Sequence, residues 1–164
     1  MPAQKPPCNV LRVFLTYRHM NAPKDDSLEH IECDVLAEHS GARVVIRCAV
    51  RKVYDALDVR AQGRLSRVME RWCDDPAKLT PAMFNGNEGR TPRHNAMLQA
   101  IKNNAAKVRL YGVSRSISDK RTFLIADADT AKKQNKADPI ILKRAKSRID
   151  DVLDIIEKYE KKDL

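Results

Sequence analysis

The sequence predicts an α+β domain in which two helices from the N-terminal half and a C-terminal helix pack on one face of a small antiparallel sheet. Two observations carry this prediction. Residues 51–73 hold an apolar stripe at helical spacing. Several β-rich segments between residues 107 and 128 precede a last amphipathic stretch. The chain has 164 residues, which is enough for one domain with a substantial core.

Residues 1–40 are predicted to form an N-terminal extension, partly flexible and with possible extra strands, and residues 41–164 the main domain. Residues 10–17 are β-rich, and residues 28–39 fit both helical and strand periodicity. Because the turn signal Ser40-Gly41 precedes the apolar run at residues 42–50, a β-hairpin is the preferred interpretation of this region.

The helical stripe at residues 51–73 contains Gly63, so two helices with a break within residues 59–63 fit the pattern as well as one helix. Residues 77–92 are rich in Gly, Asn and Pro and predict a loop. Residues 93–103 are then expected to form a short helix, with Met97, Leu98 and Ile101 facing inward.

Three strands are predicted next, at residues 107–113, from residue 115 or 116 onward, and at residues 121–128. Ser118-Asp119 is the expected turn between the last two. Asp138 is expected to cap a final helix that begins at Pro139. The end of this helix, residues 157–164, is expected to fray.

The charge pattern indicates an anionic partner. The formal net charge is +9, and residues 132–148 hold seven Lys and Arg residues against one acid, Asp138. Positive charge that passes from the end of a strand to a helix is a common way to bind a phosphate backbone. A basic protein without such a partner is the alternative, because charge alone does not define a function.

Several other classes of function lack support in the sequence. The four cysteines form no Cys-x-x-Cys pair, and no His stands at a matching ligand spacing, so we expect neither a metal site nor a cofactor. We expect reduced thiols and a cytoplasmic location, since no secretory leader is evident. We expect no membrane contact, because no apolar run approaches about 20 residues.

Four short segments of the sequence resemble motifs of a known family. They are Arg109-Leu110-Tyr111-Gly112, Lys120-Arg121-Thr122-Phe123, and the basic segments at residues 132–139 and 142–148. Together they resemble the RelE/ParE toxin superfamily, in particular its HigB-like, phage-derived branch. The block at residues 60–72 is similar to the second helix of that family. The resemblance spans about residues 42–156 and implies a RelE-like fold with a cognate antitoxin protein as partner.

The resemblance implies a toxin of a type II toxin–antitoxin system, but it does not select one activity. Many members cleave mRNA in the ribosomal decoding site, whereas the ParE side of the superfamily poisons DNA gyrase. We expect a ribosome-dependent, metal-independent mRNA endonuclease that inhibits translation. A gyrase toxin and a non-catalytic nucleic-acid-binding or phage accessory protein are the alternatives.

Cleavage through the RNA 2′-hydroxyl needs a proton acceptor, a group that stabilises the phosphorane and a proton donor. Arg and Lys suit the second role because they bind phosphate oxygens. From the resemblance and the basic cluster, we expect four catalytic residues: Arg115, Arg121, Lys132 and Lys133. The expected RNA-binding residues are Arg109, Tyr111, Lys136, Lys143 and Arg144.

Each of these residues also has a structural interpretation. Arg115 could be a solvated strand residue, Tyr111 a core aromatic, and the lysines part of a solubilising loop. The acid and base are not assigned. His94 is expected at the surface, and Asp127 and Asp129 are expected as a strand-end pair bonded to neighbouring lysines, more than as a base or a metal site.

Overall fold

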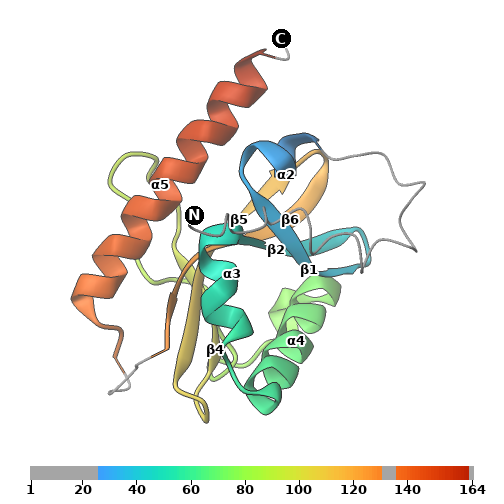
Figure 1. Cartoon of the computed structure of the whole chain (residues 1–164), viewed down its shortest axis with the longest axis vertical. Coiled ribbons are helices and arrows are strands. Elements are labelled where there is room, and N and C mark those ends of the chain that lie inside the picture. Colours follow the sequence, from blue (N-terminus) through green and yellow to red (C-terminus); the bar gives the residue numbers. More distant parts are fainter. Residues whose placement is uncertain (1–25, 131–135, 163–164) are drawn as a thin grey trace, which may run out of the picture.

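The computed structural model describes residues 26–130 and 136–162, which form a sheet between two layers of helices (Figure 1). The sheet has six strands in the order β1-β2-β6-β5-β4-β3. The strands are β1 Cys33–His39, β2 Ala42–Arg47, β3 Phe84–Asn85, β4 Gln99–Asn103, β5 Val108–Ile117 and β6 Lys120–Asp129. The helices are α2 Asp26–His30, α3 Cys48–Asp55, α4 Val59–Asp74 and α5 Pro139–Lys162, with a short 3-10 helix at Pro76–Lys78.

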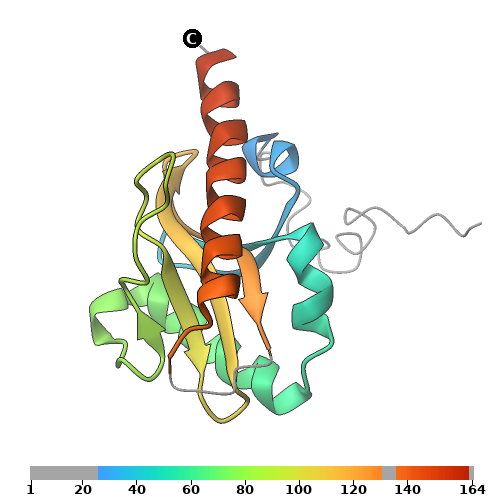
Figure 2. The same ribbon diagram turned by 90° about the vertical axis from the view of Figure 1, so that its left-hand side faces the viewer.

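Helices cover both faces of this sheet, so the prediction that they share one face is wrong. On one face, α3 and α4 bury residues such as Leu65 and Trp72 against Phe123 of β6. On the other face, α2 and α5 bury residues such as Ile149 against Leu124 of β6. Figure 2 looks onto the face that α5 covers. Alternate residues of β6 thus enter two separate cores.

The sheet is mixed, whereas a purely antiparallel sheet was expected. β2 and β6 run parallel, from the pair Ala42–Arg121 to the pair Ile46–Ile125, and the other neighbouring strands run antiparallel. A parallel pair needs a long crossover connection, and the segment that contains α3, α4 and three strands supplies it. The α+β class is confirmed in this broader form.

Both predicted tight turns are confirmed. Ser40 and Gly41 join β1 to β2 with φ of 53° and 73°, and Ser118 and Asp119 join β5 to β6 with φ of 51° and 60°. Two successive residues at positive φ are typical of the two-residue turn that matches strand twist. Residues 33–39 are therefore a strand of a hairpin, and α2 and a turn at residues 31–32 precede this strand.

Residues 51–73 form two helices and not one, which was one of the two alternatives that the sequence allowed. The break lies at residues 56–58, just ahead of the predicted position, and Gly63 lies inside α4. Asp58 caps α4 by accepting a hydrogen bond from the backbone N–H of Ala61 at 2.8 Å. Asp138 likewise accepts from the backbone N–H of Ile140 at 2.8 Å, so the predicted cap of α5 is confirmed.

The helix predicted at residues 93–103 is wrong, because Gln99–Asn103 is strand β4. Ala100 faces the α5 core and Ile101 the α4 core. A strand buried on both faces loses its polar alternation, which is why its apolar spacing looked helical. Two smaller predictions also fail: β5 is one continuous strand, and α5 stays helical to Lys162, where fraying from residue 157 was expected.

The structure also bears on the expectations about membrane contact and about the cysteines. None of the helices among residues 26–130 and 136–162 is long and apolar enough to cross a membrane. Cys33 and Cys73 are buried and lie outside any disulfide, but Cys48 is disulfide-bonded, so the expectation of reduced thiols is wrong for Cys48.

Candidate active site on the α5 face

Asp127 of β6 joins the sheet to the basic half of α5. Its side chain is only 2% exposed. Arg144 donates to it from Nε at 2.8 Å and from Nη2 at 2.9 Å, and Arg148 donates from Nη1 at 2.7 Å. A two-point arginine–carboxylate contact is strong and directional, and it raises the pKa of Arg144 further above its ordinary value. Arg144, which was expected to bind RNA, therefore helps to hold α5 on the sheet.

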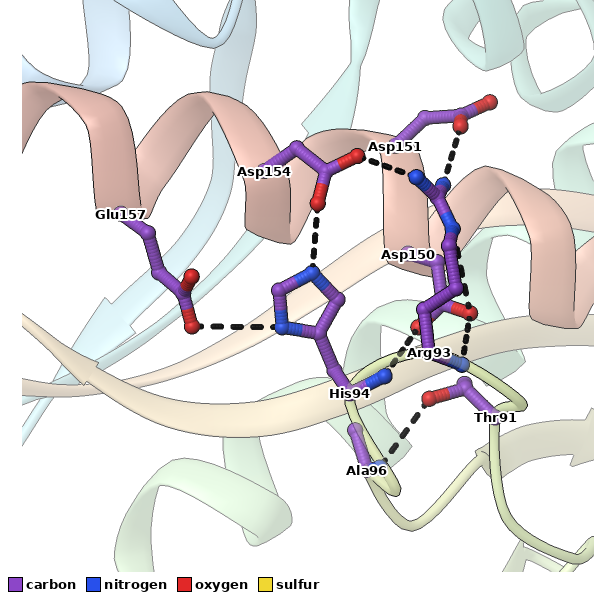
Figure 3. A network of polar contacts seen from close by, with 8 residues as sticks. All are labelled: Thr91, Arg93, His94, Ala96, Asp150, Asp151, Asp154 and Glu157. Carbon is purple, nitrogen blue, oxygen red and sulfur yellow. Dashed lines mark hydrogen bonds and ion pairs between the residues drawn. The ribbon is translucent and has the colours of Figure 1, made fainter.

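Asp150 of α5 anchors the loop that precedes β4 (Figure 3). The side chain is fully buried and accepts hydrogen bonds from the backbone N–H groups of Arg93 at 2.9 Å and His94 at 3.2 Å. Burial alone would raise the pKa of Asp150, but the hydrogen bonds from Thr91 and from these two N–H groups lower it below its usual range. The carboxylate is thus ionised and fixes the loop against the helix.

His94 lies between two carboxylates of α5 (Figure 3). Its Nε2 is 2.7 Å from Oδ1 of Asp154, and its Nδ1 is 3.2 Å from Oε1 of Glu157. A protonated ring would donate to both carboxylates, one from each nitrogen. The hydrogen bond from His94 lowers the pKa of Asp154. The His94 side chain is 15% exposed, so it is more buried than the surface position that we expected.

Arg115 of β5 extends toward the last turns of the same helix. Its Nη2 donates to Oε2 of Glu160 at 2.9 Å. The Arg115 side chain is 29% exposed and that of Glu160 is 52% exposed. A single contact with an exposed acid is weak. The guanidinium is therefore held in place loosely enough to bind a phosphate group.

His94 and Arg115 line the same pocket, which has a volume of about 230 Å³. Glu157 lines it as well, together with Ser114 and Gln99, whose side chains are hydrogen-bonded to each other at 2.5 Å. The pocket thus combines a guanidinium, an imidazole and a carboxylate. These groups can stabilise negative charge, donate a proton and accept one.

Arg121, the second arginine expected in catalysis, lies on the opposite face of the sheet. Its Nη1 and Nη2 donate to the carbonyl oxygens of Trp72 at 3.1 Å and Cys73 at 2.6 Å. Its guanidinium also lies 4.4 Å from the centre of the Trp72 ring. Arg121 therefore caps the C-terminus of α4, and the structure separates it from Arg115.

Arg109 and Tyr111 are part of the scaffold. Arg109 is 5% exposed and contacts Glu88 at 2.7 Å, while Tyr111 is fully buried. Burial raises the pKa of Tyr111 to about 12. At the adjoining Gly112, a Cβ atom would lie 2.5 Å from the carbonyl oxygen of Leu124, so this close packing requires glycine. The motif that suggested RNA contacts is thus a packing motif, and neither Arg109 nor Tyr111 offers a surface to RNA.

The predicted lysines are only partly covered by the structure. Lys136 and Lys143 are exposed, and Lys143 lines a second pocket beside α5. Lys132 and Lys133 lie outside the described residues. Within residues 26–130 and 136–162, no group of three or more His, Cys, Asp or Glu side chains is arranged to hold a metal ion.

The fold and the pocket define an α+β protein with a mixed sheet and a charged site between the sheet, a loop and the C-terminal helix. Comparisons with known proteins add no relative, since no family model, curated protein or solved structure matches the chain.

Proposed function

We propose that this protein is an RNA-cleaving toxin of the RelE/ParE type that cuts mRNA on the ribosome and is neutralised by an antitoxin protein. The observation that carries the proposal is the pocket in which Arg115 meets His94 and Glu157. Arg115 is the arginine that the sequence resemblance selects for the scissile phosphate, and the other two residues supply the acid and base that the sequence left unassigned.

Each group has a role in attack by the 2′-hydroxyl. The Glu157 carboxylate accepts the 2′-hydroxyl proton while the 2′-oxygen bonds to phosphorus. The Arg115 guanidinium binds the non-bridging oxygens and stabilises the charge of the phosphorane. The His94 imidazolium protonates the 5′-oxygen as the bond from phosphorus to that oxygen breaks. The products are a 2′,3′-cyclic phosphate and a free 5′-hydroxyl.

The two carboxylates that contact His94 suit different roles. The contact with Asp154 is the shorter at 2.7 Å, and the pKa of Asp154 is lowered by His94. Asp154 therefore orients the ring. Glu157 is 44% exposed and contacts the ring at 3.2 Å, so an entering ribose can replace that contact and meet the carboxylate.

The test is primer extension on a defined mRNA in a reconstituted translation reaction, with and without ribosomes. The wild-type protein should give discrete cuts only when ribosomes are present. Arg115→Ala should lower cutting at least about 100-fold, since it removes charge stabilisation from the transition state. Arg64→Ala is the matched control, because Arg64 is an exposed arginine of α4, on the other face of the sheet.

An intact message in the presence of active ribosomes would overturn the proposal. If expression instead caused a DNA-damage response without loss of mRNA, the gyrase alternative would replace it. If the chain were not toxic and bound nucleic acid only in a salt-sensitive manner, it would be a non-catalytic binding protein.

A further inference from the structure

A second pocket lies between the loop before β4 and the basic half of α5, with a volume of about 500 Å³. Three of its lining residues are apolar or carry a ring, namely Pro92, Pro139 and Leu142. Four others are cations, namely Arg90, Arg93, Lys143 and Lys146. None of these seven residues takes part in the chemistry proposed for the His94 pocket.

Three of the four cations in this pocket form no ion pair in the described part of the chain, although the ionised Asp150 also lines it. Within the described part of the chain, Lys143 and Lys146 have no acidic partner, and Arg90 donates to the backbone oxygen of Asn95 at 2.8 Å. Asp150 also lines the pocket, but it accepts hydrogen bonds from two backbone N–H groups. The charge of Arg93 is neutralised by its ion pairs with Asp151 and Asp154.

The end of the Lys146 side chain lies beside the loop backbone at Gly89. A Cβ atom at Gly89 would lie 2.7 Å from Nζ of Lys146, and Gly89 has a φ of 98°. Any other residue would strain the backbone and would displace the end of the lysine side chain. The loop backbone and the Lys146 side chain therefore contact each other directly at this pocket.

We infer that the second pocket binds one nucleotide unit of single-stranded RNA. The base would lie against Pro92, Pro139 and Leu142, and its phosphate would contact Lys143 and Lys146. The volume is in the range of small-molecule sites, and lysine binds phosphate as a compact charge. An acidic peptide would meet the same cations, but a carboxylate side chain has no flat apolar face for the other wall.

This inference rests on the proposed function for the identity of the ligand, because it places a nucleotide near the one that is cut. Both pockets adjoin the loop that Asp150 holds against α5: His94 lines the first, and Arg90 and Pro92 line the second. A single RNA strand could therefore contact both pockets.

The test measures binding of a short fluorescent single-stranded RNA by anisotropy, using full-length protein with Arg115→Ala to prevent cutting. Lys143→Ala with Lys146→Ala should lower the affinity about tenfold or more. It should also reduce the slope of log affinity against log salt by about 1.4, the value for two lost contacts with single-stranded phosphates. The control is Lys158→Ala with Lys161→Ala, which removes the same charge from exposed positions on the same helix and should change the affinity less than twofold.

An equal loss in both double variants would assign binding to overall charge and overturn the inference, as would an unchanged affinity. A glutamate-rich peptide that bound as tightly as the RNA, with the same loss in Lys143→Ala/Lys146→Ala, would make an acidic protein segment the occupant and also overturn it. Cutting on ribosomes is measured separately. If the protein did not cut mRNA but lost RNA binding only in Lys143→Ala/Lys146→Ala, the proposed function alone would be overturned. If it cut mRNA and that variant bound RNA normally, the inference about the second pocket alone would be overturned.

Discussion

The two faces of the sheet differ in how their helices are held. On the face of α3 and α4, apolar side chains such as Leu65, Met69 and Trp72 fill the contact. The α5 face has an apolar core too, but it also buries Asp127 and Asp150, each with several hydrogen-bond donors. Buried charges are tolerated only with such partners. One face therefore contributes mainly stability, and the other also positions charged groups around a pocket.

The largest effect is expected from the apolar face. Leu65→Ala removes a fully buried side chain of α4 and should lower the free energy of unfolding by about 3 kcal/mol. Urea denaturation would measure this loss. RNA cutting per folded molecule should stay at the wild-type level, because α4 contributes nothing to the His94 pocket. A loss of cutting as large as that of Arg115→Ala would show that the two faces are not separable.

Asp150→Ala should have the next largest effect. It leaves the N–H groups of Arg93 and His94 without their acceptor, which should cost about 2 kcal/mol of stability. Cutting should fall as well, since the loop no longer holds His94 in place. Asp151→Ala is the control on the same helix, because its side chain is 61% exposed and should change stability by less than about 0.5 kcal/mol. Equal losses in the two variants would refute the anchoring role of Asp150.

The pH dependence of stability should distinguish the two faces. The pKa of Asp150 is lowered in the folded protein, so its contribution is fully present above the unfolded value of about 4. It is lost as the pH falls through the lowered folded value. The stability gap between wild type and Asp150→Asn should therefore narrow below about pH 4, as measured by urea midpoints. The gap for Leu65→Ala should stay constant, and a constant gap for both variants would contradict the assignment.

Local signals predicted the parts of this fold that depend on neighbouring residues. The turns at Ser40-Gly41 and Ser118-Asp119, the cap at Asp138 and the amphipathic α4 all follow from residues close in sequence. The parallel pairing of β2 with β6 and the strand β4 depend on contacts between distant segments. No periodicity within one segment could reveal them.

The site was only partly predictable for the same reason. Arg115 was selected from the sequence, but His94 and Glu157 come from a loop and a helix that Asp150 brings together. The separation of the two arginines was predictable from the sequence. A two-residue turn at residues 118–119 pairs Arg115 with Thr122 and Arg121 with Ser116. Since facing residues share a side of the sheet and successive residues alternate, the two arginines had to lie on opposite faces.

Substitutions of Arg121 and Arg115 should change stability least. They should differ most clearly in their effect on RNA cutting. Arg121→Ala removes the cap of α4 and should cost about 1 kcal/mol with cutting retained. Arg115→Ala removes one exposed ion pair and should change stability by less than about 0.5 kcal/mol, yet lower cutting at least about 100-fold. Parallel urea denaturation and primer extension on both variants measure the two effects. If Arg121→Ala abolished cutting while it remained folded, catalysis would involve the α4 face, and the division of roles between the two faces would fail.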